Sequence, residues 1–475
     1  MDLARLEPVP ELLRRVRSEL AASFATDKPL RVARAPGRLD VMGGIADYMG
    51  SLVLEMPLQV AAAVALQERD DRQVQVFSFN LLDDHRPFQF QVPLDALAKP
   101  LDELRRDLDA PGRQWAGYAV GPLAVLHDEG LIDVATLDRG FNLAILSTVP
   151  EGGGVSSSAA LEVAAMNAFV GHLDVQQLVD DPVGLAALCQ KAENQVVGAP
   201  CGVMDQIASH MGQAGTLLKI LCQPHDVQGT LPLPDGVVAV GLNTAVKHAV
   251  GGGAYGKTRT AAFMGHRLIL DEMRKLGEAG GKTMTGDPTN GYLANLDPDD
   301  YKQLFRPRLP ETLVGAAFLD QSDSHNDPAT TIDPAETYHV QSAVDHHVLD
   351  AQRVRRFADF FERLDHHGRD KALRSAGHLM YASHKSYTDN ADLGATEADF
   401  VIDQVKQHEP AGLFGARITG GGSGGTVAVL LEDAPSAWSS IEAIQQAYEA
   451  RHDQPLTLLR DSSPGAAATG SQVVG

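Results

Sequence analysis

Apolar residues recur along most of the chain at the spacings of strands and helices. Short apolar or alternating runs predict strands at residues 30–35, 51–66, 73–77, 141–147, 216–221, 237–243 and 426–431. Helical spacing of the apolar positions predicts helices at residues 10–24, 156–169, 185–197, 203–211, 340–364, 370–383 and 400–407. These elements alternate without the regular order of a doubly wound parallel sheet, so the pattern favours the α+β class.

Two stretches depart from this pattern. Residues 283–333 are rich in Asp, Pro and Gly and weakly patterned, so we expect a partly irregular segment and interpret it as an insertion. Residues 461–475 are rich in Ser, Gly, Ala and Pro, a composition that predicts a disordered tail.

The charge balance narrows the choice of partners. The chain of 475 residues carries a formal net charge of -22. Because nucleic-acid binding needs a basic surface, we expect no nucleic-acid partner. A site for an anionic nucleotide must therefore draw its positive potential from backbone N–H groups, a metal ion and a few Arg or Lys side chains.

The N-terminus and the cysteines indicate the compartment. Acids and arginines stand where a signal peptide needs an apolar core, and no apolar run approaches the roughly 20 residues of a membrane span. Cys189, Cys201 and Cys222 form no CxxC pair, so neither zinc nor a disulfide framework is indicated. We expect a soluble, cytoplasmic protein with no membrane partner, its thiols buried or half-buried.

A glycine-rich loop precedes a helix of small residues in VPEGGGVSSSAALEVAAMNAF, residues 149–169. Three glycines allow successive N–H groups to face one concavity, and the helix start adds N–H groups that lack partners. On its glycines alone, the loop is equally an ordinary turn with a Ser N-cap, but the small residues behind it favour a phosphate site. The candidate ATP-binding residues are Glu151, Gly152, Gly153, Gly154, Val155, Ser156, Ser157, Ser158 and Ala159.

This loop resembles the phosphate-binding motif of the GHMP kinases, P-x-G-x-G-L-S-S-S-A, with Val155 in place of the usual Leu. Five further segments resemble galactokinase motifs in the same order. They are PGRLDVMG at 36–43, CGVMDQ at 201–206, the stretch 241–255 with Asn243, Val246, His248 and Tyr255, GHLMYASHKS at 377–386, and ITGGGSGG at 418–425. The resemblance covers roughly residues 25 to 455.

The resemblance implies a two-lobed GHMP kinase fold with ATP and sugar between the lobes. We expect an N-terminal lobe, ribosomal-S5-domain-2-like, at residues 1–232, and a ferredoxin-like C-terminal lobe at residues 233–460. The expected partners are ATP, Mg²⁺ and a small sugar, and the expected assembly is a monomer or weak homo-oligomer. Asp205 is the candidate general base and Arg38 the candidate partner that keeps it ionised. Ser158 and Glu193, which stands twelve residues before Asp205, are the candidate magnesium ligands.

One departure from the family bears on the sugar. Where galactokinases read G-E-H-T-D-Y, with the Glu and His contacting the sugar's hydroxymethyl end, this chain has Gly44 and Ile45, followed by Asp47. A C6 hydroxyl would be left poorly paired, at a cost of roughly 1–3 kcal/mol. The string GRLDVMGGIADY at 37–48 is similar to that of plant L-arabinokinases, so we expect phosphorylation of the anomeric hydroxyl of L-arabinose.

The candidate sugar-binding residues are Gly44, Ile45, Asp47, Gly202 and Tyr255. Galactose and a uronic acid remain alternative substrates. A C6 carboxylate would need an Arg or Lys as its partner. Positions 44 and 45 supply neither, although Lys247 or another loop could supply the positive charge.

Two different classes of function remain open. Residues 251–258, GGGAYGKT, satisfy the P-loop pattern G-x-x-x-x-G-K-[ST], but the preceding strand is expected to end near Asn243, too early for a P-loop. A catalytically silent sugar sensor on the same fold is the other alternative, although Arg38, Asp205, Ser157 and Ser158 are all present. The pairs His346–His347 and His366–His367 suit no defined metal site, and we expect them on solvated helix faces.

Overall fold

The computed structural model describes residues 2–246, 253–280 and 285–474. Its largest sheet runs in the order β14-β1-β2-β5-β3-β4, with β6 also paired to β2 and β7 to β6. All neighbours are antiparallel except β3 and β5. The strands are β1 (Leu30–Met42), β2 (Leu52–Glu68), β3 (Gln73–Ser78), β4 (Gln89–Pro93), β5 (Phe141–Ser147), β6 (Thr216–Leu221), β7 (Asp226–Pro232) and β14 (Ser471–Val474).

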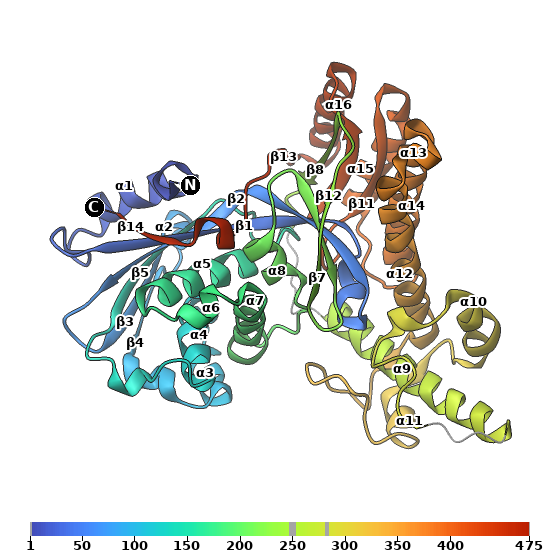
Figure 1. Ribbon diagram of the computed structural model, residues 1–475, viewed down its shortest axis with the longest axis horizontal. Helices are drawn as coiled ribbons and strands as arrows, with labels where there is room; N and C mark the ends of the chain where they lie inside the picture. Colours follow the sequence, from blue (N-terminus) through green and yellow to red (C-terminus); the bar gives the residue numbers. More distant parts are fainter. Residues whose placement is uncertain (1, 247–252, 281–284, 475) are drawn as a thin grey trace.

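Successive side chains of β1 and β2 point to opposite faces, and each face is covered. On one face, Ala33 and Val64 pack with the helices that follow β4 and β5. These are α3 (Leu101–Leu108), α4 (Gln114–Asp128), α5 (Ser157–His172), α6 (Gln176–Val179) and α7 (Pro182–Lys191). On the other face, Val32 and Ala65 pack against α1 (Val9–Glu19) and the short α2 (Phe79–Asp83). Figure 1 shows these layers in blue and green.

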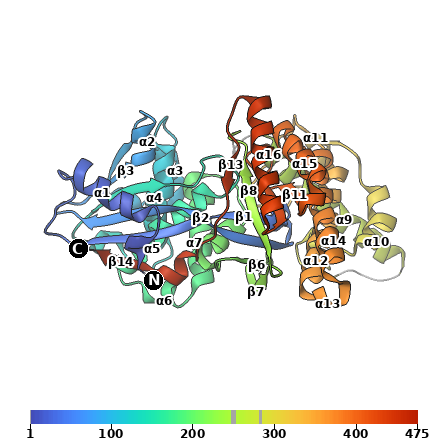
Figure 2. The ribbon, with the colours of Figure 1, turned by 90° about the horizontal axis from the view of Figure 1, so that it is seen from above.

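A second, four-stranded antiparallel sheet has the order β11-β12-β8-β13. Its strands are β8 (Val237–Asn243), β11 (Leu413–Ile418), β12 (Thr426–Glu432) and β13 (Thr457–Leu459). The helices around it are α9 (Gly253–Ala279), α12 (Val340–Glu362), α13 (Leu364–His367), α14 (Arg369–Asp389), α15 (Thr396–Gln407) and α16 (Pro435–His452). Figure 2 shows this second body beside the large sheet. The mixed, largely antiparallel architecture confirms the predicted α+β class.

The two sheets meet where β1 and β2 extend beyond their helical cover. Leu39 and Val41 of β1 share an apolar cluster with Phe357 of α12, Met380 of α14 and Ala428 of β12. Strand β1 was expected to end at residue 35, but it continues through Pro36 and Gly37 to Met42. Its pairing with β2 shifts register between Pro36 and Arg38, which lets the strand absorb the proline and carry on into the junction.

The expectation of a disordered tail at residues 461–475 is wrong for the described residues. The short helix α17 (Ala466–Thr469) buries Ala466, and β14 then pairs antiparallel with the outer side of β1, from Leu30 to Ala33. The composition of the tail suggested disorder, but β1 offers a row of unpaired backbone groups that this segment completes. The tail therefore belongs to the large sheet.

The segment expected to be irregular is described from residue 285. It contains only short elements: α10 (Pro298–Asp300), α11 (Gly315–Leu319), brief 3₁₀ and π turns, and β9 (Leu313–Val314), which pairs with β10 (Thr337–Tyr338). Figure 1 places it in yellow next to α9 and α12. In the part of the chain that the structure describes, no helix is long and apolar enough to cross a bilayer.

Candidate active site

The glycine-rich loop curls as its composition predicted. Gly152 and Gly154 have positive φ angles of 69° and 71°, and Ser156, at 61°, also takes the left-handed conformation. Helix α5 begins immediately afterwards at Ser157, so its free N–H groups face the loop. The hydroxyl of Ser156 is buried without a hydrogen-bond partner among the described residues. Glu151 differs from the rest because it is exposed and lies 3.8 Å from Arg86. The loop thus offers backbone donors and a helix start suited to phosphate.

Neighbouring segments fix the loop in this shape. Thr426 donates a hydrogen bond of 2.7 Å to the carbonyl of Gly153. Arg38 donates through Nη1 to the carbonyl of Gly154 at 2.7 Å and through its backbone N–H to Val155 at 3.1 Å. The loop, the start of β12 and the middle of β1 therefore form one connected structure.

Arg38 and Asp205 lie together beside this loop. The guanidinium donates to Asp205 Oδ1 from Nε at 3.0 Å and from Nη2 at 2.8 Å. Arg38 is buried, whereas a fifth of the Asp205 side chain is exposed at the start of α8 (Met204–Met211). Burial opposes the charge of Arg38, but Asp205, Glu55 and Asp40 outweigh it and raise the pKa of the guanidinium above its usual value. Asp205 thus faces a permanently charged neighbour.

Glu193 lies in a π-helical turn, Ala192–Val197, that follows α7. Gln206 Nε2 donates to it at 2.6 Å and also to Glu162 at 3.3 Å. Burial first, and then the nearby charge of Asp205, raise the pKa of Glu193 to about 7, while a hydrogen bond with Ser158 acts in the opposite direction.

This cluster fits a small, hard cation. It gathers two buried carboxylates, a serine hydroxyl and an amide oxygen, and Glu162 Oε1 and Gln206 Oε1 have no hydrogen-bond partner among the described residues. Oxygen donors of this kind suit Mg²⁺, which usually binds one or two carboxylates and keeps several waters. Within the described ranges, no group of three or more His, Cys, Asp or Glu side chains forms a metal cluster by itself.

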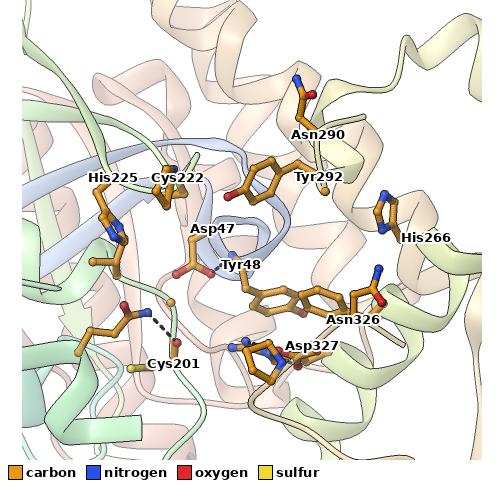
Figure 3. Close-up of a pocket in the computed structure, with 18 residues that line it drawn as sticks. Asp47, Tyr48, Cys201, Cys222, His225, His266, Asn290, Tyr292, Asn326 and Asp327 are labelled. Atoms are coloured by element: carbon orange, nitrogen blue, oxygen red, sulfur yellow. Dashed lines mark hydrogen bonds and ion pairs between the residues drawn. The ribbon is translucent and has the colours of Figure 1, made fainter. Parts of the chain in front are cut away.

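A cavity of about 340 Å³ has Asp47 among its lining residues (Figure 3). Gly202 and Val203, just before α8, also line it, whereas Asp205 is not among the described lining residues. A Cβ at Gly202 would lie 1.6 Å from Asp47 Oδ2, so any larger residue there would displace the Asp47 carboxylate. Burial, together with the charge of Asp205, raises the pKa of Asp47 to about 7. A buried carboxylate at a cavity wall is a strong hydrogen-bond acceptor for a polyhydroxyl ligand when it is ionised.

Gly44 and Ile45 are not among the described residues that line the cavity. They begin the 3₁₀ turn Gly44–Met49, which carries Asp47. Gly44 has a φ of 52°, and a Cβ there would lie 1.7 Å from the hydroxyl of Tyr387. That hydroxyl accepts from the N–H of Ile45 at 2.8 Å and donates to Gly420 at 2.8 Å. Gly44 and Ile45 therefore help to hold the turn that carries Asp47 in place.

Tyr255 also lies outside the lining and makes an edge-to-face contact with Tyr48, with the ring centroids 6.0 Å apart. His346 and His347 are completely buried, so the expectation of a solvated face is wrong for this pair. Helix α12 lies between α9 and α14 and therefore has little solvated face. Burial lowers the pKa of His347 to about 4 and that of His346 well below its usual value.

Several lining residues were missed from the sequence. Arg259 and Phe263 come from α9, His225 follows β6, and residues 290–292 and 326–328 come from the irregular segment. Arg259 stands four residues after Tyr255, one helical turn along the same helix, which is the signal that could have indicated it. The irregular segment carried no such signal, because its role depends on tertiary placement.

The structure of residues 253–258 does not support the P-loop alternative. Gly251 and Gly252, like Lys247 and His248, lie outside the described residues, while Gly256 to Thr258 are already helical in α9. The Thr258 hydroxyl donates to the carbonyl of Ala391 at 2.6 Å, and Lys257 pairs with Glu336 at 2.8 Å. These side chains are engaged in contacts that a magnesium-binding Ser/Thr and a phosphate-binding Lys would have to give up.

Comparison with known proteins gives matches over the same regions. Residues 120–213 match the GHMP kinases N terminal domain, and residues 19–68 match the galactokinase galactose-binding signature. The chain is 35% identical to an L-arabinokinase of Arabidopsis thaliana over 96% of its own length, and spans 48% of that protein. It is 31% identical to a galactokinase of Chloroflexus aggregans, covering 85% of this chain and 84% of the relative.

Solved structures show the same fold. The galactokinase of Lactococcus lactis complexed with galactose aligns with a TM-score of 0.72 at 22% identity, over 98% of this chain and all of that chain. A mevalonate kinase aligns with a TM-score of 0.52 at 13% identity, over 91% and 99%. At these identities the likeness concerns the fold.

Proposed function

The chain belongs to the galactokinase-like GHMP sugar kinases, and on this premise we propose that it transfers the γ-phosphoryl group of ATP to the anomeric hydroxyl of L-arabinose. In this proposal the loop at residues 152–158 binds the phosphates, and Asp205 accepts the proton of the attacking hydroxyl. The product would be L-arabinose 1-phosphate. The three free cysteines fit a reducing, cytoplasmic location.

The contacts around Asp205 support its role. Arg38 is buried against three carboxylates and contacts Asp205 directly, so its positive charge can stabilise the negative charge that develops on the transferred group. Ser158 and Glu193 would hold Mg²⁺, with Gln206 and Glu162 orienting Glu193. When bound, the ion would neutralise charge on the ATP phosphates. The chain's own residues then need only position the hydroxyl and receive its proton.

The filled space at Gly44 is the observation that carries the choice of sugar. The family resemblance implies a Glu there in galactokinases, contacting the hydroxymethyl end of the sugar. Here the hydroxyl of Tyr387 occupies the space a side chain would need, and its hydrogen bonds go to Ile45 and Gly420. Positions 44 and 45 therefore supply no polar group to a C6 hydroxyl. A pyranose that matches galactose from C1 to C4 but lacks C6, as L-arabinose does, avoids this loss.

A panel of sugars tests this choice. We expect kcat/KM for L-arabinose to exceed that for D-galactose by about 10-fold or more, because positions 44 and 45 offer the C6 hydroxyl no polar side chain and an unpaired buried hydroxyl costs roughly 1–3 kcal/mol. The measurement is ADP release with each sugar at fixed ATP. A higher kcat/KM for D-galactose would contradict the pentose proposal. Sugar binding without ADP release would indicate a sensor instead of an enzyme.

The raised pKa of Asp47 predicts a pH dependence. Burial and the charge of Asp205 favour the protonated carboxyl, so below pH 7 an increasing fraction of Asp47 loses acceptor capacity for sugar hydroxyls. We expect kcat/KM for the sugar to fall as the pH is lowered from 8 to 6, while kcat at saturating sugar changes less.

The Asp47→Asn variant is the control for this titration. Its kcat/KM should be low throughout and should lack the part of the acid limb that Asp47 causes. An identical acid limb in the variant and the wild type would assign the titration to another group.

A further inference from the structure

The sugar cavity contains a buried ion pair that the proposed reaction does not use. Arg259 of α9 donates to Asp327 of the irregular segment from Nε and from Nη2, both at 2.8 Å. The side chain of Asp327 is completely covered and that of Arg259 is 7% exposed. Both residues line the cavity that Asp47 lines (Figure 3). A two-point contact of this kind uses the guanidinium edge with which arginine normally binds a carboxylate ligand.

Arg259 is also held by contacts that do not involve Asp327. Its guanidinium lies 4.9 Å from the ring centre of Tyr48 and 5.7 Å from that of Phe263. Nη1 donates to the carbonyl of Pro200 at 3.4 Å, next to the segment that contains Gly202. Stacking on aromatic faces keeps a guanidinium in place. Arg259 would therefore stay at the cavity wall if the charge of Asp327 were removed.

The charges around the cavity disfavour an anionic ligand. Of the described lining residues, Arg259 is the only Arg or Lys, and Asp327 neutralises it, while Asp47 adds a second carboxylate. The histidines do not compensate, because burial lowers the pKa of both His225 and His266. With Asp47 ionised, the described lining of the cavity carries one net negative charge. Its one arginine is already paired with Asp327.

We propose that Asp327 is a specificity-determining residue: by occupying Arg259, it restricts the acceptor cavity to uncharged sugars and excludes sugars that carry a carboxylate. This inference rests on the proposed function, in which the cavity binds the acceptor sugar. It gives the irregular segment a role, since that segment brings Asp327 to the cavity. It also separates neutral sugars from uronic acids, which the sequence left open.

The wild-type protein gives the first test. D-galacturonate and D-galacturonamide have the same shape and differ in charge, so both are measured as competitive inhibitors of the phosphorylation of a neutral sugar. We expect the uronate to bind about tenfold or more weakly than the amide, because it meets like charge without a cation to pair with. Equal inhibition constants, or tighter binding of the uronate, would overturn the proposal.

The Asp327→Asn variant gives the second test. It keeps a carbonyl oxygen for the N–H of Ala329 but removes the charge facing Arg259. We expect the affinity ratio of uronate to amide to rise about tenfold, since Arg259 becomes available to the ligand. In the Arg259→Gln/Asp327→Asn double variant this gain should disappear. Glu336→Gln is the matched control. It removes a carboxylate that pairs with Lys257, which belongs to the same helix as Arg259 but lies outside the cavity lining, so the ratio should stay unchanged.

The outcomes separate this proposal from the one on which it rests. If no neutral sugar is phosphorylated, the proposed function fails, and the inference fails with it. If neutral sugars are phosphorylated but Asp327→Asn leaves the ratio at its wild-type value, only the inference is overturned. If Asp327→Asn does not fold, the comparison of uronate and amide on the wild-type protein decides.

Discussion

Replacing Asp205 by Asn should lower kcat by about 10²–10⁴-fold while the protein stays folded. Asparagine keeps an oxygen for the Arg38 contacts at 2.8 and 3.0 Å, but it cannot accept the proton of the sugar hydroxyl. Arg38 keeps its hydrogen bond to the Gly154 carbonyl and its contact with Glu55, with Nε and Oε2 3.2 Å apart, so the loss of one carboxylate is tolerated. The measurement is single-turnover ADP formation, with a thermal melt to show that the fold is retained.

Arg38→Lys is the companion variant. Lysine keeps the positive charge that faces the buried Glu55 but loses the planar fork that reaches both Asp205 and Gly154. A strong loss of kcat with a near-native melting temperature is expected. Asp102→Asn, in an exposed pair with Arg106, is the control and should change neither quantity. Wild-type turnover in both Asp205→Asn and Arg38→Lys would remove these residues from the chemistry.

Replacing Asp40 by Ala should cost about 3–5 kcal/mol of the free energy of unfolding. Asp40 and Arg417 are both completely buried, with Oδ2 and Nη1 2.7 Å apart, and the Asp40 carboxylate also accepts from the N–H groups of Gly44 and Gly420. Nε and Nη2 of Arg417 have no hydrogen-bond partner among the described residues, so the variant would leave a buried charge uncompensated. The measurement is equilibrium unfolding in urea.

Asp102→Ala provides the comparison for this stability effect. Its side chain is 76% exposed and pairs with an exposed arginine, so it should change stability by less than about 1 kcal/mol. A change of that small size for Asp40→Ala would show that the Asp40–Arg417 pair does not stabilise the junction between the two sheets.

The conformation of the glycine-rich loop could be anticipated from a local pattern, and the contact between Arg38 and Asp205 from the family resemblance. A run of glycines before a helix of small residues permits the positive φ angles of Gly152 and Gly154, and contacts from Thr426 and Arg38 then hold the loop. The apolar patterns of β5, β6 and β8 likewise gave their ranges directly. The family resemblance then indicated which distant segments would meet at that loop.

The remaining features depend on contacts that no local pattern encodes. Tyr387 fills the space beside Gly44 from more than 300 positions away along the chain, and no local pattern shows that positions 44 and 45 lie outside the described lining of the cavity. His347 was expected on a solvated helix face, yet its ring is buried, with its centre 4.9 Å from that of the Tyr48 ring. The tail gains its structure from the free edge of β1, the burial of Ala466 and the hydrogen bond from Ser463 to the Leu58 carbonyl. Each case is a tertiary contact overriding a compositional signal.

A crystal structure with a nonhydrolysable ATP analogue, Mg²⁺ and L-arabinose would show directly whether phosphate, sugar and Asp205 meet. We expect the phosphates against the backbone of residues 152–158, the sugar in the cavity with Asp47, and its anomeric oxygen within about 2.6–3.2 Å of the Asp205 carboxylate. Phosphates bound at residues 253–258, or a terminal phosphorus remote from Asp205, would contradict this arrangement.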